Sequence, residues 1–158
     1  MSQNTAVKYT LGEEIFNAVS HGVGAALAVA GCVIVVVFAS FTGNAWAIVS
    51  CSIYSAMTIL AFLASTLYHS LTAPKAKAVF RVFDHNSIFL FIAGTYTPFT
   101  LVTLRGTVGW TIFGVVWGAS IIGIILNSIS IDRFKIFSMI AYVATGWAII
   151  FAIFPLSV

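Results

Sequence analysis

The stretch that decides the fold is residues 17–41, NAVSHGVGAALAVAGCVIVVVFASF, which contains no Asp, Glu, Lys or Arg. A bilayer core about 30 Å thick requires about 20 apolar residues in one helix. Stretches of similar composition follow, so we predict spanning helices near residues 17–41, 45–68, 83–104, 108–126 and 136–156. The predicted fold class is therefore an all-α, polytopic transmembrane helix bundle, with residues 1–158 forming a single transmembrane domain.

Composition agrees with this prediction and excludes other classes of protein. Hydrophobic residues make up 61% of the chain and charged residues 7%, whereas a soluble domain averages about 25% charged residues. The net charge is +3, and the seven basic residues are divided among short connectors instead of lying on one face, which excludes a nucleic-acid-binding surface. Membrane lipid is the partner that we expect.

The basic residues also predict the orientation of the chain. Connectors are expected at residues 42–44, 71–81, 105–107 and 127–135, so alternate helices run in opposite directions. Six of the seven basic residues then fall on one side, which should be the cytoplasmic side: Lys8, Lys75, Lys77, Arg81, Arg133 and Lys135. The N-terminus is predicted to be cytoplasmic and Val158 to lie on the opposite side.

Small residues and a proline predict local features of two helices. Gly114 and Gly118 have the spacing that lets two membrane helices approach closely, so they are candidates for a packing contact or for homo-oligomer formation. Pro98 removes a backbone hydrogen bond inside the third predicted helix, and we expect a kink between Thr95 and Pro98.

Polar residues gather at the predicted cytoplasmic ends of three helices. Ser65 and His69 are one helical turn apart, and Asp84 and His85 are expected to open the next helix. The first helix adds three residues on one face at the same end: Glu14, Asn17 and His21.

Ionisable residues in membrane segments are rare and usually functional, so this cluster indicates a metal or proton-transfer site just below the membrane surface. The alternative is that these residues only cap helix ends and anchor them at the interface, with Asp84 complementing a helix dipole.

The same residues carry a family resemblance. The runs Glu14–Gly22 (EIFNAVSHG), Ser65–Ser70 (STLYHS), Phe83–His85 (FDH) and Ala93–Pro98 (AGTYTP), in this order, resemble the haemolysin III family. This is the bacterial branch of the progestin and adiponectin receptor superfamily. The resemblance covers nearly the whole chain and implies a seven-helix bundle with a cytoplasmic N-terminus, in the bacterial inner membrane.

The resemblance also implies a zinc ion near the cytoplasmic side, held by three histidines, and a suspected lipid-amide hydrolase chemistry. It assigns His69 as a metal ligand and Ser65 and Asp84 as catalytic residues. The other two family ligands come from a His-x-x-x-His motif, which this sequence lacks. We therefore expect this chain to be a partial family member that lacks the last two helices and binds zinc weakly or not at all. His21 and His85 could replace the missing ligands, but the family pattern does not support this.

Three functions follow as hypotheses. The first is a zinc-dependent, lipid-directed hydrolase or lipid-homeostasis protein. The second is a pore-forming cytolysin, as the family name indicates, although the helix centres show no continuous polar stripe. The third is a sensor or receptor that responds to membrane lipid without catalysis.

Overall fold

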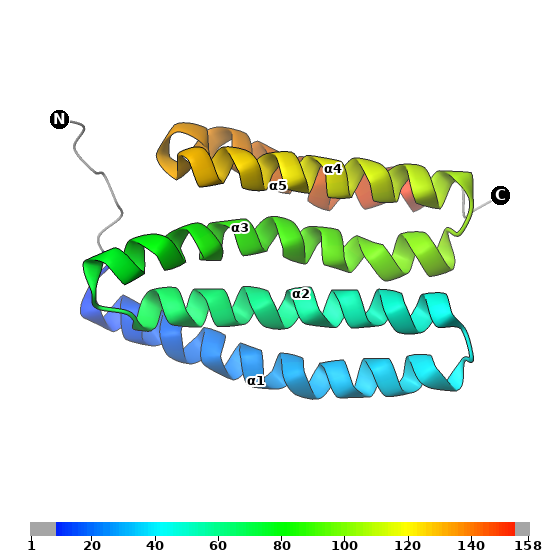
Figure 1. Cartoon of the computed structure of the whole chain (residues 1–158), viewed down its shortest axis with the longest axis horizontal. Helices are drawn as coiled ribbons and strands as arrows, with labels where there is room; N and C mark the ends of the chain where they lie inside the picture. The colour runs from blue at the N-terminus through cyan, green and yellow to red at the C-terminus, as the bar shows by residue number, and fades with distance from the viewer. Residues whose placement is uncertain (1–8, 154–158) are drawn as a thin grey trace.

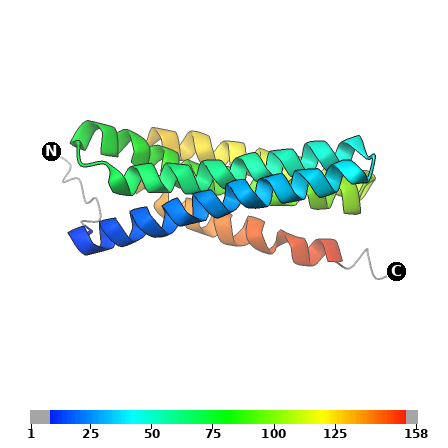
Figure 2. The same ribbon diagram turned by 90° about the horizontal axis from the view of Figure 1, so that it is seen from below.

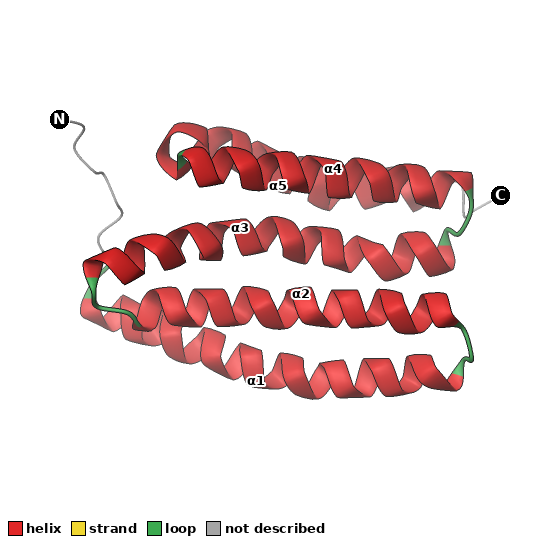
Figure 3. Ribbon diagram, in the orientation of Figure 1, coloured by secondary structure: helices red, strands yellow, loops and turns green. Residues whose placement is uncertain are grey.

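The structure is a computed structural model that describes residues 9–153, without the side chains of residues 148, 149 and 151–153. The described part is helical, with short connections between the helices (Figures 1 and 3). Its elements are the α-helices α1 (Leu11–Phe41), α2 (Ala45–Ser70), α3 (Pro74–Pro98), α4 (Thr107–Ile129) and α5 (Ile131–Ile153), and a π-helical segment, η1 (Phe99–Thr103).

The helices alternate in direction, as short connections require (Figure 1). One end of the bundle carries the start of α1, the α2–α3 connection and the α4–α5 connection; we call it the basic end, because Lys75, Lys77, Arg81, Arg133 and Lys135 all lie there. Within the described range, the backbone of α1 packs against α2 and the Glu14–Lys77 ion pair joins α1 to α3, while α5 packs against α3 and α4. Figure 2 shows α1 running obliquely to α2.

Three of these helices are long and apolar enough to cross a membrane: α1, α2 and α4. The all-helical bundle and its membrane character are thus as predicted. The prediction that α3 and α5 also cross, and that the N-terminus is cytoplasmic, stays a prediction. In α3, basic residues occupy the first two turns and lower the hydropathy of the helix.

Three helices, α1, α3 and α5, begin five or more residues earlier than predicted, because polar residues continue the helix beyond its apolar part. Helix α1 starts at Leu11 instead of Asn17, with a capping box in which the Thr10 hydroxyl accepts from the Glu13 backbone N–H and the Glu13 carboxylate accepts from the Thr10 backbone N–H. Helix α3 starts at Pro74, where proline suits the first helical position because its missing N–H would have had no partner.

The prediction of a solvated loop over residues 71–81 is therefore wrong, and Asp84 does not open a helix. Only residues 71–73 lie between α2 and α3. Asp84 lies ten residues into α3, so its interpretation as a cap on a helix dipole is also wrong. The connector predicted at residues 127–135 shrinks to Ser130 alone, because α4 and α5 end and begin on either side of it.

Pro98 changes the hydrogen bonding of the chain that follows it. The segment directly after it, η1, has π-helical bonding, and the backbone N–H of Leu104 donates to the Phe99 carbonyl at 3.0 Å. Such π segments occur where a helix accommodates a local irregularity, here the hydrogen bond that proline cannot make. The kink that we predicted between Thr95 and Pro98 stays a prediction.

The bundle core lies where α3 faces α4. Phe89, Ala93 and Val116 are buried, and close approach depends on glycine: a Cβ on Gly123 would lie 2.2 Å from the Phe89 ring. Some buried hydroxyls have partners inside the bundle, as where the Trp117 indole N–H donates to the Thr97 hydroxyl at 3.1 Å, whereas the hydroxyls of Ser50, Ser55 and Ser120 have none among the described residues. This core fixes the position of α3 and hence of the polar residues near its start.

Candidate functional site

A cavity of about 370 Å³ opens between α1, α2 and α3 toward the basic end. Four of the predicted site residues line it: His21 from α1, Ser65 and His69 from α2, and Asp84 from α3. Its remaining lining is mostly apolar and comes from Ala61, Phe62, Ser87, Ile88 and Phe91. Residues that are 63 positions apart in the sequence thus meet around one space, which we call the histidine cavity.

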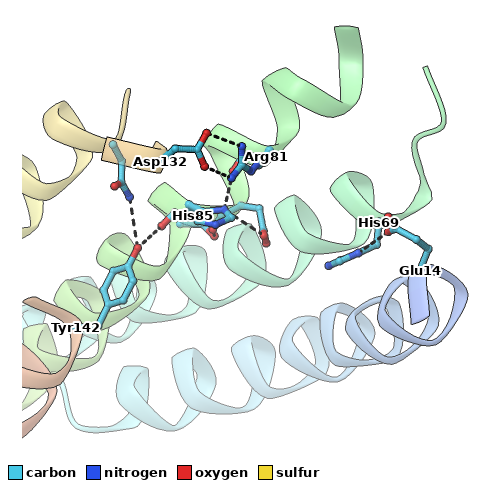
Figure 4. Close-up of polar contacts among 9 residues, drawn as sticks. Glu14, His69, Arg81, His85, Asp132 and Tyr142 are labelled. Atoms are coloured by element: carbon cyan, nitrogen blue, oxygen red, sulfur yellow. Dashed lines mark hydrogen bonds and ion pairs between the residues drawn. The ribbon is translucent and has the colours of Figure 1, made fainter. Parts of the chain in front are cut away.

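Glu14 orients the His69 side chain (Figure 4). Its Oε2 atom lies 2.7 Å from His69 Nδ1, and its Oε1 atom lies 2.7 Å from Lys77 Nζ. An ionised carboxylate only accepts hydrogen bonds, so Nδ1 carries the proton and donates it to Glu14. In the neutral imidazole the other nitrogen, Nε2, then keeps its lone pair.

The Glu14 network is shielded from solvent. The side chains of His69 and Glu14 are 7% and 16% exposed, and Tyr68 and Tyr9 cover the imidazole with ring centroids 4.7 and 5.3 Å from it. Lys77 also lies over the Tyr68 ring, with Nζ 5.0 Å from the centroid. Charged hydrogen bonds are stronger in such surroundings than in water, so the His69 ring is held firmly.

His21 lies next to His69 in the same cavity. The two rings are stacked with centroids 6.4 Å apart, and the His21 Nδ1 atom is buried without a hydrogen-bond partner among the described residues. A buried polar atom without a partner is costly, and such atoms occur at sites that take a ligand or a water. His21 therefore has one ring nitrogen without a hydrogen-bond partner and lies beside His69, whose ring is oriented by Glu14.

The remaining predicted residues lie outside this cavity. Asn17 is half-buried on α1, and its backbone carbonyl accepts from the Ser20 hydroxyl at 3.2 Å. His85 lies on α3, where its Nδ1 donates to the Arg81 carbonyl at 2.9 Å, and it lines another cavity. The three histidines share the basic end as predicted, but the structure places His85 apart from the other two.

A second polar cluster joins α3, α4 and α5, and our reading of the sequence missed it (Figure 4). Arg81 binds Asp132 through a 2.7 Å contact, and the Tyr142 hydroxyl donates to the His85 carbonyl at 2.9 Å. The bidentate hydrogen bonds from Arg81 lower the pKa of the Asp132 carboxyl from its ordinary value. The signal in the sequence was the helical spacing of Asp132, Lys135, Ser138 and Tyr142, which places four polar residues on one face of α5.

The zinc ion that the resemblance implies needs at least three protein ligands at a catalytic site. Among the described residues, no group of three or more His, Cys, Asp or Glu side chains is arranged to hold a metal ion. The histidine cavity offers His69, with the carboxylate partner typical of a metal-bound histidine, and His21 with one unpartnered nitrogen. The described residues therefore do not by themselves fit a zinc site.

Comparisons with known proteins agree with the resemblance. A family model described as "Haemolysin-III related" matches residues 9–158. The chain is 45% identical to "Hemolysin-3" of Bacillus cereus over 144 residues, which are 91% of this chain and 66% of that relative. It is 41% identical to "Hemolysin-3 homolog" of Bacillus subtilis (strain 168) over 148 residues, which are 94% of this chain and 70% of that relative.

The chain thus spans about two thirds of the length of these curated relatives. No solved structure matches it significantly. The residues that the family model matches include all three helices that are long and apolar enough to cross a membrane. The match over nearly the whole chain shows that this membrane protein belongs to the haemolysin III-related family.

Proposed function

We propose that this protein acts on a membrane lipid as a hydrolase, with the histidine cavity as its reacting centre. The observation that carries the proposal is the 2.7 Å contact that fixes His69 against Glu14 while His69 lines the same cavity as Ser65 and Asp84. An oriented imidazole beside a hydroxyl and a carboxylate is an arrangement suited to proton transfer.

The chemistry assigned to each residue follows from its contacts. Neutral His69 can take a proton from water at Nε2, because Glu14 holds the other nitrogen in its protonated form. The Lys77 ammonium favours the ionised form of Glu14, and the ionised carboxylate stabilises the imidazolium that forms. Asp84 can accept or return a proton across the cavity, and the Ser65 hydroxyl can hydrogen-bond a substrate carbonyl.

A lipid suits this cavity better than a soluble substrate does. The lining is mostly apolar between its polar groups, with Phe62, Ile88 and Phe91 among the contributors. The cavity lies toward the basic end, and two of its three helices, α1 and α2, are long and apolar enough to cross a membrane. Near the end of a spanning helix, the polar part of a lipid meets its acyl chains. The family resemblance adds lipid amides as the substrate class.

The described residues do not complete a site for zinc. We propose that this chain binds zinc weakly, with His69 as its principal ligand. One or two nitrogen donors do not compensate for the free energy that a doubly charged ion loses when it gives up its water on entering a partly buried cavity.

The experiment uses the full chain in phosphatidylcholine nanodiscs with a fluorescent fatty-acyl amide lipid, and an ester-linked analogue as a second substrate. His69→Ala should lower turnover by about a hundredfold or more, the lower range for the loss of a general base. Glu14→Gln should also lower turnover, since a neutral amide no longer stabilises imidazolium. Glu13→Gln is the matched control: Glu13 belongs to the capping box, where glutamine is equally suitable, and among the described residues its side chain hydrogen-bonds to Thr10 alone.

Two results would contradict the proposal. Turnover that survives His69→Ala would show that His69 is not the base. Saturable binding of the amide lipid without turnover would favour a membrane-lipid sensor instead. Cytolysis, which the names of the relatives suggest, is tested separately by dye release from vesicles, and release that persists in His69→Ala would assign a pore independent of this cavity.

A further inference from the structure

A second cavity, of about 240 Å³, lies between α3, α4 and α5 at the basic end. We call it the arginine cavity. Its volume is several times the roughly 30 Å³ that one water molecule occupies in the liquid. The polar residues that line it are Arg81, His85, Asn127, Asp132, Lys135, Ser138 and Tyr142.

The neutral polar groups of this cavity already satisfy one another. The Ser138 hydroxyl donates to Asn127 Oδ1 at 2.6 Å, and the Tyr142 hydroxyl donates to the His85 carbonyl at 2.9 Å. Asn127 Nδ2 lies 3.5 Å from the Tyr142 oxygen. These bonds make a rigid wall on one side of the cavity and leave little hydrogen-bonding capacity for a neutral ligand.

Cationic donors, by contrast, remain available. Arg81 has five N–H donors, and its described contacts with Asp132 use two of them, at 2.7 and 3.5 Å. Lys135 is exposed, and no described residue forms an ion pair with it. The cavity therefore has two cations and one carboxylate, and its unused N–H donors favour a negatively charged hydrogen-bond acceptor.

The surroundings indicate an amphiphilic ligand. The cavity is at the basic end of the bundle, which lies at a membrane surface if the helices cross. The adjacent face of α5 carries exposed apolar residues at helical spacing, with Ile136, Met139, Ile140 and Val143 between 58% and 61% exposed. A ligand with a negatively charged group in the cavity and a hydrocarbon tail along this face would satisfy both surfaces.

We propose that the arginine cavity binds the phosphate of an anionic phospholipid, with Arg81 and Lys135 as the groups that recognise its charge. The N–H donors of Arg81 that Asp132 does not use suit phosphate oxygens, and the exposed Lys135 ammonium adds a mobile point charge. This site shares no lining residue with the histidine cavity, so it stands whether or not the proposed hydrolase function is correct.

The test counts lipids bound to the purified chain in neutral detergent by native mass spectrometry, with phosphatidylglycerol and phosphatidylcholine as probes. Lys135→Gln should weaken phosphatidylglycerol binding about fivefold, the effect expected for one basic residue near an anionic surface. Arg133→Gln is the matched control, because Arg133 is exposed at the same end and loses the same charge but does not line the cavity. Binding of phosphatidylcholine should be weak and equal in all three proteins.

Glycerol 3-phosphate distinguishes the two sources of the phosphate group. If it competes with phosphatidylglycerol, the phosphate alone is recognised and a soluble phosphate can also occupy the cavity; if it does not, the site requires the lipid. Equal weakening by Lys135→Gln and Arg133→Gln would overturn the proposal, since it would show only general attraction to a basic surface. Phosphatidylcholine that binds as tightly as phosphatidylglycerol would overturn it as well.

Discussion

Replacing Gly109 with alanine should destabilise the bundle through a backbone collision. Gly109 lies in the first turn of α4, against the π-helical segment η1. An added Cβ would lie 2.2 Å from the Thr100 carbonyl oxygen and 2.4 Å from the Leu104 carbonyl oxygen. Ordinary contact begins at 3.4 Å, so these backbone atoms would have to move by about 1 Å.

The magnitude follows from two opposing effects. Overpacking costs about 1 to 3 kcal/mol, and the upper end applies here because backbone and not a flexible side chain must move. Alanine also favours the helix over glycine by up to about 1 kcal/mol. The net loss should be about 2 kcal/mol in the free energy of unfolding, or about a thirtyfold change in the equilibrium constant.

Unfolding in mixed micelles with increasing SDS, followed by tryptophan fluorescence, measures this loss. Gly114→Ala is the control on the same helix, because a Cβ there meets nothing within 4 Å. It should leave the stability unchanged or slightly higher. Equal stability of the Gly109 and Gly114 variants would refute the inferred contact between α4 and η1.

Four further results are expected. Purified chain should contain far less than one zinc per molecule by elemental analysis. A co-expressed helix with two histidines one turn apart should raise the zinc content, and His69→Ala should remove that gain. One tightly bound zinc in the chain alone would contradict this prediction. Compartment-specific reporters fused to the two ends should report opposite sides of the membrane, and cytoplasmic signals from both would exclude five spans. Arg81 lowers the pKa of Asp132 below its ordinary value of 3.8, so the stability from their ion pair is present above pH 3.8 and is lost as the pH falls through the lowered pKa. Asp132→Asn should therefore lower the thermal unfolding temperature relative to the parent chain at pH 7, and the difference should be smaller in acid. If α4 pairs with a second copy of the chain, Gly118→Ile should lower the cross-linked dimer fraction, and an unchanged fraction would exclude pairing through this face.

The apolar parts of the helices were predictable from the sequence, whereas their polar ends were not. The second helix ends at Ser70, within two residues of the prediction, because its apolar run and its helix end together. The third begins nine residues before the prediction, at Pro74. Hydropathy indicates where a segment leaves the hydrocarbon, but a helix continues as long as its backbone hydrogen bonds and its side chains allow. Here Lys77 and Arg81 form ion pairs with carboxylates on neighbouring helices, which stabilises the polar start of α3.

The candidate site was predictable in its residues but only partly in its geometry. Ser65 and His69 share a face because helical residues four apart always do. That Glu14 contacts His69, and that His85 does not join it, depends on how α1 and α3 are rotated about their own axes. Packing against α2 and α4 sets that rotation, and it follows from many small contacts, such as Gly123 on Phe89, that no short motif encodes.

The length of α1 has a mechanical consequence. Its 31 residues make a helix about 46 Å long at a rise of 1.5 Å per residue, well beyond a hydrocarbon core of about 30 Å. Such a helix must either extend into the headgroup region or tilt, and its tilt changes with the thickness of the bilayer. Because the α1 backbone packs against α2 and Glu14 lies in the first turn of α1, a change of tilt would act on the contacts of Glu14 with His69 and Lys77. A change in bilayer thickness would in this way reach the histidine at the centre of the proposed site.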